Sequence, residues 1–504
     1  MPLPTRLAHR GLRLRPLRLC ALLSLLALVV ACSEQSGPSG DEQLPPAPSA
    51  SFTATPASGT APLPVTFDAT ASTGEGLTFA WEFGDGSGAV GVTTSRTFGS
   101  AGAFEVTLTV TDAHERTDTA TKQVLVSDPS PDTPEGPRFV SVSAGAGGTL
   151  ALGSDGNLYA WGDGTRGQNG TALDDHELEP VPVVGLEGAP LAFHRGYAHS
   201  LVVLADGAAV AWGWNLDAAL GTGDEEDRWQ AHPVMMPEGV RFEKVAASRS
   251  SFALDQDGRG WAWGVNLNGS LGIGSYQPAS LPTAIQMPAG TRFTQIESYF
   301  GVTIALDQAG AVWTWGRGRY GALGAGTEVT GDRVVPGPID APAEMGAVLT
   351  VGVHSNTAAA LDEHGQVWTW GSNHYGELGD GTEEPRFSPG KVQQPEGVLF
   401  EDLAVGDYYM VALDQSGRAW SWGSNTSGRL GVGEDPADLG RSALPMPVAM
   451  PDGVRFTAVT VGSHHAVAID QDGNAWTWGY NPRGQLGDGT TEDRWEPTLV
   501  KAPW

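Results

Sequence analysis

The sequence predicts an all-β protein in which a seven-bladed β-propeller follows a small β-sandwich. A tryptophan–glycine pair recurs seven times after residue 138, at spacings of 51 to 56 residues, and each pair ends a segment with strand-like alternation. A repeat of about 50 residues built from strands is typical of propellers, in which each unit forms one blade. Residues 49–127 contain several short alternating segments without this repeat, which favours a separate sandwich.

The composition indicates a folded, acidic protein. The chain has 504 residues, of which 40% are hydrophobic, and its formal net charge is −29. The first 31 residues carry five arginines and no acid, so their removal would change the charge from −29 to −29 − 5 = −34. This charge argues against nucleic-acid binding, which requires a basic surface that neutralises phosphates. Because Cys20 and Cys32 are the only two cysteines, we expect the folded domains to be stabilised by packing rather than disulfides.

The N-terminal segment predicts export. Arginines precede a 13-residue apolar run, which is shorter than the ~20 residues of a membrane-spanning helix and typical of a signal peptide. The run ends in "LVVAC", which resembles the lipobox of bacterial lipoproteins. The resemblance implies that residues 1–31 are removed and that Cys32 becomes the lipidated N-terminus, anchored in the cell envelope at the outer membrane or cell surface. Residues 32–48 would then form a disordered tether.

Residues 49–127 are expected to form the sandwich. "WEFGDG", followed by "FGSAGAFEVTLTVTD", resembles the polycystic-kidney-disease (PKD) domain. Trp81 and Phe83 share one face of a strand and are predicted to enter the core. Asp85 lies in the following turn, where we expect it to bond its own backbone rather than a ligand. The proline-rich residues 128–137 would form a linker to the propeller, residues 138–504.

Each propeller unit has the same order of segments. A leading strand is followed by a strand of the "RFTAVTVG" type, a strand ending in Asp-Gly, and a strand of the "NAWTWG" type, after which comes "xNxxGxLG". We expect the WG segment to be the fourth strand of its blade. Its two tryptophans, at positions i and i+2, face the same side. Twelve of the 17 tryptophans belong to these strands and are predicted to pack between blades.

The units closely resemble the regulator of chromosome condensation repeat, over all of residues 138–504. Two positions depart from its "W-G-x-N-x-x-G-Q-L-G" line: Asn169 replaces the leucine and Ala218 replaces the leading glycine. Only some units keep the family's histidine, as at His199, His354 and His465. These histidines come from different blades without metal-ligand spacing, so we expect them to pack in turns rather than bind a metal.

The ends of the repeat region predict how the ring closes. The first unit begins at "RFVSVSAG" without a leading strand, whereas the chain ends in "EPTLVKAP", a leading strand without a unit. We therefore expect the C-terminal strand to complete the first blade and remove its open edge.

No catalytic motif is present in the sequence. H-E-x-x-H, G-x-S-x-G, a P-loop and a cysteine nucleophile are all absent. We therefore predict a binding protein with no catalytic residue, metal or cofactor. Guanine-nucleotide exchange, which the resemblance to the repeat family implies through its founding member, requires a cytosolic GTPase and conflicts with the leader. "DQDGNAWTW" also resembles the Asp-box of sialidases, so a propeller glycosidase is a further alternative, which a panel of glycan substrates would test.

The variable loops give the candidate binding site. The two residues between "WGxN" and "GxLG" differ in every unit, while the surrounding frame barely changes. Equivalent loops of a propeller lie on one rim, so these pairs and the residue after each WG should form a ring. Aromatic residues and arginine often dominate binding energy. The candidate residues for binding an extracytoplasmic protein or glycan to this monomeric protein are Trp214, Arg317, Arg319, Tyr320, His374, Tyr375, Tyr480 and Arg483.

Overall fold

The computed structural model describes residues 45–60, 63–100, 102–127, 138–326 and 331–502. The chain divides into two compact units, residues 1–133 and 134–504. The predicted signal peptide (1–31), the lipidation residue Cys32, most of the tether and the linker 128–137 lie outside the described residues. None of the helical turns in the described part of the chain has the length and hydropathy of a membrane-spanning helix.

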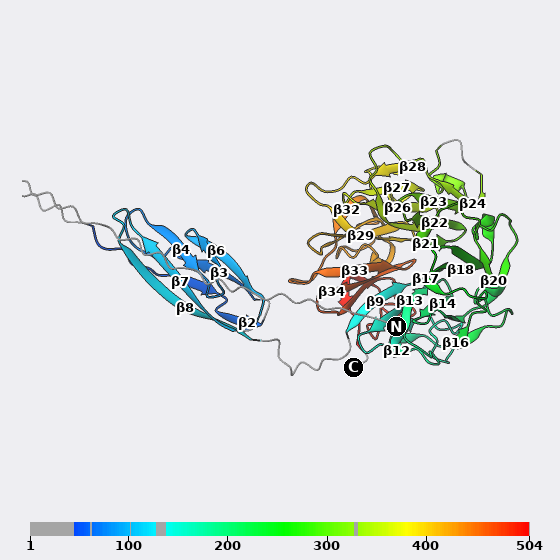
Figure 1. The fold of residues 1–504 in the computed structure, drawn as a ribbon, viewed down its shortest axis with the longest axis horizontal. Helices are drawn as coiled ribbons and strands as arrows, with labels where there is room; N and C mark the ends of the chain where they lie inside the picture. The colour runs from blue at the N-terminus through cyan, green and yellow to red at the C-terminus, as the bar shows by residue number, and fades with distance from the viewer. Residues whose placement is uncertain (1–44, 61–62, 101, 128–137, 327–330, 503–504) are drawn as a thin grey trace, which may run out of the picture. The chain divides into compact units, whose positions relative to one another are not determined.

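The first unit is a two-sheet sandwich (Figure 1). One sheet has the order β1-β3-β6 and the other β2-β8-β7-β4-β5. The strands are β1 (Thr53–Thr55), β2 (Ser58–Thr60), β3 (Leu63–Asp68), β4 (Thr78–Glu82), β5 (Gly88–Val90), β6 (Thr93–Phe98), β7 (Gly102–Thr111) and β8 (Thr117–Ser127).

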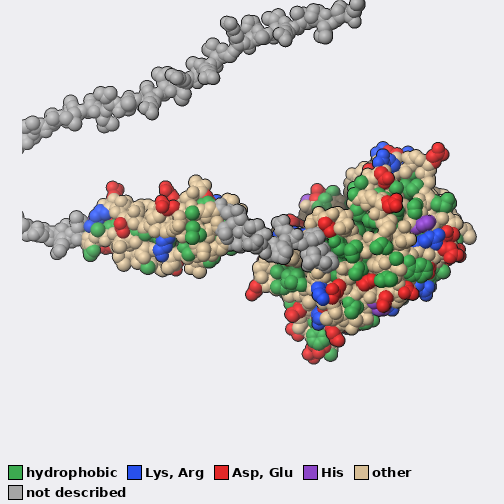
Figure 2. Space-filling view, turned by 90° about the horizontal axis from the view of Figure 1, so that it is seen from below, with side chains coloured by type: hydrophobic (Ala, Val, Ile, Leu, Met, Phe, Trp, Pro, Cys, Tyr) green, Lys and Arg blue, Asp and Glu red, His purple; other side chains and the backbone are tan. Residues whose placement is uncertain are grey.

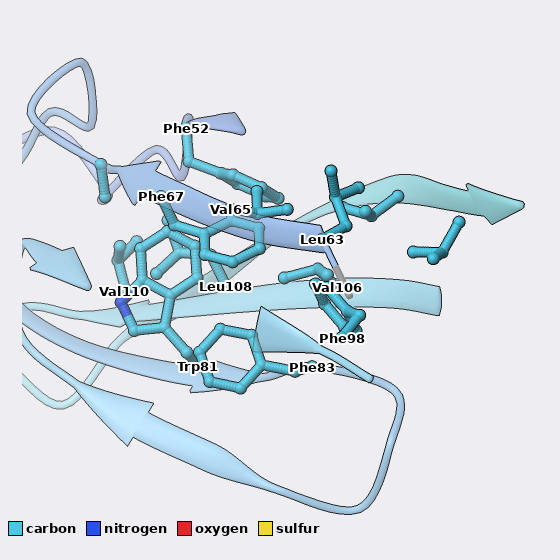
Figure 3. Close-up of a cluster of buried hydrophobic side chains, with 13 residues drawn as sticks. Phe52, Leu63, Val65, Phe67, Trp81, Phe83, Phe98, Val106, Leu108 and Val110 are labelled. Carbon is cyan, nitrogen blue, oxygen red and sulfur yellow. The ribbon is translucent and has the colours of Figure 1, made fainter. Parts of the chain in front are cut away.

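The sandwich core forms around Trp81 and Phe83, as the sequence predicted. Both side chains are only 2% exposed, and Figure 3 shows them among aromatic and aliphatic side chains from both sheets. The rings of Trp81 and Phe52 meet edge to face with centroids 5.1 Å apart. Asp85 accepts hydrogen bonds from the backbone N–H of Ser87 and from Arg96, which confirms its role in the turn.

The second unit is a propeller of seven four-stranded antiparallel sheets within the described residues. The first strands are β9 (Phe139–Ala144), β13 (Pro190–Arg195), β17 (Phe242–Ala247), β21 (Phe293–Tyr299), β25 (Val348–His354), β29 (Phe400–Gly406) and β33 (Phe456–Val461). The second strands are β10 (Gly148–Gly153), β14 (His199–Leu204), β18 (Ser250–Asp255), β22 (Val302–Asp307), β26 (Thr357–Asp362), β30 (Tyr409–Asp414) and β34 (His465–Asp470).

The outer half of each blade holds the WG segment and the strand after it. The third strands are β11 (Leu158–Gly162), β15 (Ala209–Gly213), β19 (Gly260–Gly264), β23 (Val312–Gly316), β27 (Val367–Gly371), β31 (Ala419–Ser424) and β35 (Ala475–Gly479). The fourth strands are β12 (Glu177–Pro182), β16 (Arg228–Pro233), β20 (Ala279–Ala284), β24 (Arg333–Pro338), β28 (Arg386–Lys391), β32 (Arg441–Pro447) and β36 (Arg494–Leu499). First strands of neighbouring blades contact one another around the ring, and the labelled fourth strands lie at its periphery (Figure 1).

The predicted position of the WG segment within the blade was wrong. It is the third strand, and the segment taken as a leading strand is the fourth strand of the preceding blade. The loop after WG causes this arrangement because it folds back on its own blade. In blade five, the Asn373 side chain accepts a hydrogen bond from the Leu378 N–H at 2.9 Å and donates one to the Thr382 carbonyl at 3.0 Å. The returning chain then pairs with the WG strand, with Trp368 opposite Lys391.

The tryptophans pack as predicted and in two different environments. The tryptophan of each WG pair is fully buried between blades, and in six of the seven blades its indole N–H donates to a carbonyl of the preceding blade. In blade six, Trp422 donates in this way to Glu377 at 2.9 Å. The first tryptophan instead bonds the aspartate of its own hairpin, as Trp476 bonds Asp470 at 2.8 Å. The aspartates of these five hairpins are therefore structural acceptors.

The predicted ring closure by the C-terminal strand was also wrong. β36 pairs with β35 of its own blade, and blade one is already completed by β12. Blades seven and one join by packing instead. The Trp161 indole donates to the Gln485 carbonyl at 3.0 Å, and Phe139 packs in one cluster with Ile469 and Val500. Because each sheet is complete in itself, the last blade closes the ring through the same contacts that join the other blades.

Candidate functional site

Two sets of loops meet at one end of the propeller. The inner turns connect first and second strands, and the WG loops connect third and fourth strands. Because the strands are antiparallel, both sets lie at the same end, which we call the WG rim. The Asp-Gly hairpins between second and third strands lie at the opposite end, the hairpin rim. The inner turns follow the strands that line the axis, so they surround the centre of the WG rim.

The WG loops are rigid supports for their variable side chains. Four of them contain a short 3₁₀ turn: η1 (Leu216–Ala218), η2 (Leu267–Gly269), η3 (Arg319–Gly321) and η4 (Thr426–Gly428). Each turn holds two consecutive residues with positive φ, of which the first is never a glycine, as with Tyr320 at φ 56°. This conformation is unusual for residues other than glycine and persists only where surrounding contacts enforce it. The variable residues are therefore presented on a fixed frame.

An open cavity of about 760 Å³, which we call the mouth, lies at the centre of the WG rim. Four of the eight predicted residues line it: Trp214, Arg317, Tyr480 and Arg483. Arg483 forms an ion pair with Asp163, which also lines the mouth. The ring predicted from the WG loops thus reaches the propeller axis at blades one, two, four and seven.

The other four predicted residues lie on the same rim but do not line the mouth. Arg319 and Tyr320 belong to η3, and His374 and Tyr375 to the WG loop of the next blade. Tyr320 and His374 meet edge to face with ring centroids 5.6 Å apart. Tyr375 contacts Tyr408, a mouth residue, with centroids 5.1 Å apart. Aromatic side chains therefore continue outward from the mouth over blades four to six.

The inner turns supply residues of the mouth that the sequence interpretation missed. Tyr197, Phe300, Asn356, Tyr408 and His464 line the mouth from five different inner turns. Phe300 and Tyr408 have positive φ values of 41° and 63°. The signal that could have revealed them is the change of residue type in the short turn before each second strand. These turns share no common motif, whereas the WG loops do.

A hydrogen-bonded cluster lies at the base of the mouth. The rings of Tyr299 and His354 stack with centroids 3.4 Å apart, and the Tyr299 hydroxyl lies 2.6 Å from that of Ser463. His354 Nδ1 faces an oxygen of Asp407 at 3.5 Å, and Ser355 donates to the same oxygen at 2.6 Å. The cluster joins blades four, five, six and seven across the axis, beside a narrower cavity of about 170 Å³ between the first strands.

Burial sets the charge states within this cluster. Burial raises the pKa of Asp407, but the hydrogen bonds from His354 and Ser355 outweigh burial and leave the pKa below its ordinary value. Burial also lowers the pKa of His354, although Asp407 opposes the effect. Burial raises the pKa of Tyr299. At neutral pH the cluster is therefore an ionised carboxylate beside a neutral imidazole and a neutral phenol, and its hydrogen bonds hold the base of the mouth in shape.

The histidines singled out in the sequence are buried packing groups. His199 lies 2.8 Å from the Ser251 hydroxyl, and His465 lies 3.1 Å from the Thr149 hydroxyl, each across a boundary between blades. Burial lowers the pKa of each to about 3. In the part of the chain that the structure describes, no group of three or more His, Cys, Asp or Glu side chains is placed to hold a metal ion.

The irregular WG loop of blade one is stabilised by a buried arginine. Gly164 occupies the position of the usual loop asparagine, and Asn169 fills the space from the leucine position. Arg195 donates to the Asn169 side chain at 3.0 Å and to the Asp163 carbonyl at 2.8 Å. Burial lowers the pKa of Arg195 to about 9. Asn169 at the leucine position therefore goes together with Gly164 and Arg195, and the three residues jointly preserve the shape of the loop.

Comparison with known proteins identifies both units. The RCC1-like domain matches residues 195–504, and single regulator of chromosome condensation (RCC1) repeats match residues 139–168 and 155–203. The chain belongs to the RCC1-like family. A PKD domain matches residues 45–126, so the sandwich predicted to resemble that domain is one.

Among curated proteins, the chain is similar to the ultraviolet-B receptor UVR8 of Arabidopsis thaliana, at 29% identity over 369 residues that cover 72% of this chain and 82% of the receptor. It is also similar to the E3 ubiquitin-protein ligase HERC2 of Homo sapiens, at 31% identity over 359 residues. That match covers 70% of this chain but only 7% of the ligase.

Solved structures confirm the architecture. Human WBSCR16 superposes with a TM-score of 0.62 at 21% identity, covering 69% of this chain and 94% of that one. Yeast RCC1 (Prp20), solved bound to Kap60, superposes with a TM-score of 0.61 at 21% identity, covering 75% and 92%. These likenesses establish the propeller fold.

Proposed function

We propose that the protein is a lipid-anchored binding protein of the bacterial cell envelope that holds a partner protein on the WG rim. The observation that carries this proposal is the concentration of varied aromatic and arginine side chains on uniform, rigid loops around the mouth. Aromatic residues and arginine dominate the energetics of many protein interfaces. Loops on a rigid scaffold are also the usual location of recognition sites.

The paired aromatic side chains support this use of the rim. Tyr320 is 47% exposed and Tyr375 is 39% exposed, yet each is held by a neighbouring ring. Side chains that are already ordered lose less conformational entropy when a partner binds. The relatives support a protein partner, because yeast RCC1 has been solved bound to Kap60 and studied for its binding to Gsp1p and histones.

The location in the envelope rests on the N-terminal sequence. The apolar run followed by "LVVAC" and a polar tether supports cleavage before Cys32 and acylation of that residue. Several acyl chains would anchor the protein stably, whereas one chain binds a membrane only marginally. This location disfavours guanine-nucleotide exchange, which requires a cytosolic GTPase.

The hairpin aspartates weaken the glycosidase alternative. The Asp470 carboxylate accepts hydrogen bonds from the backbone N–H groups of Asp472 and Asn474 and from the Trp476 indole. A carboxylate with these partners serves as a turn acceptor, and it lies on the hairpin rim rather than in the mouth. The Asp-box-like sequence therefore has a structural explanation.

Site-specific photo-crosslinking in cells tests the proposal. A photoreactive residue would replace Tyr320, Tyr375 or Tyr480 on the WG rim, with Gln256 and Gln415 on the hairpin rim as matched exposed controls. We expect the same crosslinked protein from the WG-rim positions and none from the controls. Crosslinks from the hairpin rim alone would contradict the assignment of the binding face.

A further inference from the structure

One side of the mouth combines arginines with aromatic rings. Along the loops of blades one to four, these residues line the mouth and the small pocket beside it, and we call them the basic-aromatic arc. The Arg166 guanidinium lies 5.1 Å from the Trp214 ring centroid, and Arg249 lies 5.9 Å from that of Phe300. The rings of Tyr197 and Phe300 meet edge to face at 5.5 Å. The members of the arc are Arg166, Tyr197, Trp214, Arg249, Phe300 and Arg317.

Six arginines of the propeller form ion pairs with carboxylates among the described residues, and the arginines of the arc are not among them. Within the described residues, Arg166, Arg249 and Arg317 form no ion pair, and the side-chain hydrogen bond of Arg317 goes to the neutral Asn268 amide at 3.1 Å. In contrast, Arg386 and Arg494 bind carboxylates at 2.6 Å and 2.7 Å. The arc thus groups three unpaired arginines in a protein with a net charge of −29. Acidic side chains are frequent over the visible propeller face in Figure 2.

The carboxylates near the mouth compensate these charges only in part. Asp163 is paired with Arg483, and Asp407 is bonded by Ser355 and faces His354. Asp217 lies beside the arc in the small pocket between Trp214 and Arg249, and forms no ion pair among the described residues. Asp332 also forms no ion pair among the described residues, and it accepts hydrogen bonds from Asn268 and Gly318 beside Arg317. Three guanidinium groups, those of Arg166 and Arg317 at the mouth and that of Arg249 in the adjoining pocket, are therefore accompanied by two unpaired carboxylates.

The position over an aromatic ring leaves Arg166 and Arg249 ready to bind anions. A guanidinium that lies over an aromatic face keeps its N–H donors in its own plane, where they match the two oxygens of a carboxylate. Stacking also restricts the side chain before a ligand arrives, which lowers the cost of binding. The rings between the arginines offer apolar surface. The arc thus suits a ligand that carries several carboxylates with apolar groups between them.

We infer that the basic-aromatic arc binds an acidic peptide segment of the partner protein. Its Asp or Glu carboxylates contact Arg166, Arg249 and Arg317, and its apolar side chains pack on the intervening rings. This inference rests on the proposed function and specifies the chemistry of the partner. A peptide is favoured over a small anion because the three cations are spread over blades one, three and four, with Arg166 and Arg317 at the cavity of about 760 Å³ and Arg249 in the small pocket beside it. It is favoured over an anionic glycan because the arc presents apolar rings between its charges.

Peptide binding measured by fluorescence anisotropy tests the inference. The probe is a fluorescein-labelled peptide of twelve residues that alternates Glu with Leu and Gly, compared with the same peptide carrying Gln in place of Glu. The variant combines Arg166→Ala, Arg249→Ala and Arg317→Ala. A matched control combines Arg259→Ala, Arg292→Ala and Arg418→Ala, three exposed arginines at the hairpin rim. Circular dichroism and the melting temperature establish that both variants are folded.

We expect the Glu peptide to bind the unmodified protein more tightly than the Gln peptide, and added salt to weaken the difference. The arc variant should bind the Glu peptide about tenfold more weakly or worse, while the hairpin-rim control should match the unmodified protein. Equal binding of the Glu peptide by the arc variant would overturn the inference. A sulfated oligosaccharide that binds the arc while the Glu peptide does not would overturn the choice of a peptide.

The two proposals can fail separately. If photo-crosslinks from the WG rim persist but the Glu peptide does not bind the arc, the rim is still the binding face and the inference about acidic chemistry is wrong. If the crosslinks occur only at the hairpin rim, the proposed binding face itself is wrong.

Discussion

Replacing Gly379 with alanine probes how neighbouring blades are joined. Gly379 has φ +66°, and a β-carbon there would lie 2.8 Å from Nε1 and 3.0 Å from Cδ1 of Trp422. Trp422 is fully buried at the blade boundary and donates to the Glu377 carbonyl. The left-handed backbone costs alanine about 1–2 kcal/mol, and overpacking a dense core costs about 1–3 kcal/mol. We therefore expect Gly379→Ala to lower the free energy of unfolding by about 2–5 kcal/mol.

Gly397→Ala provides the matched control. Gly397 has φ +77°, but a β-carbon there would meet no heavy atom within 4 Å. It should therefore lose only the backbone contribution of about 1–2 kcal/mol. Guanidinium unfolding followed by tryptophan fluorescence would give both values, since most tryptophans report on the propeller. Equal unfolding midpoints for the two variants would refute the claim that the WG-loop glycine is required by the tryptophan of the next blade.

Three further predictions concern the last blade, pH and the anchor. Deleting residues 494–504 should speed hydrogen exchange in β35 but not in β11, because β36 pairs with β35 in blade seven. Faster exchange in β11 but not in β35 would instead support pairing of the C-terminal strand with blade one. Burial holds the pKa of His199 and His465 at about 3, below the ordinary value. The unfolded chain therefore binds these protons first, and stability should fall as the pH drops below about 6.5, by about 2 kcal/mol per histidine at pH 5; unchanged urea midpoints between pH 7 and 5 would contradict this. Cys32→Ser should abolish labelling by a clickable fatty acid, and equal labelling of the variant would exclude lipidation at that residue.

Features that depend on residues close together in the sequence were predictable. The recurrent WG pair identified seven blades, and the spacing of the tryptophans placed their rings on one strand face, where Trp370 and Trp422 are fully buried. The PKD-like turn at Asp85 was recognisable for the same reason, because the carboxylate bonds a residue two positions away. Such contacts depend on short spacings that a sequence displays directly.

Features that depend on strand pairing were not predictable. The segment before each first strand pairs backward with the WG strand, and only its hydrogen bonds reveal which blade it completes. The inner turns lacked a fixed motif, so Tyr197 and Tyr408 were missed although both line the mouth. Arg195 was also missed, because its role depends on Gly164 and Asn169 in a loop 26 to 31 residues away.

The most direct test of the WG rim as the binding face is hydrogen–deuterium exchange of the full-length protein, measured alone and with the partner identified by crosslinking. We predict slower exchange in the inner turns and WG loops, especially around Trp214, Phe300 and Tyr408, with the hairpin rim unchanged. Protection confined to the Asp-Gly hairpins or to the PKD domain would contradict the assignment of the WG rim.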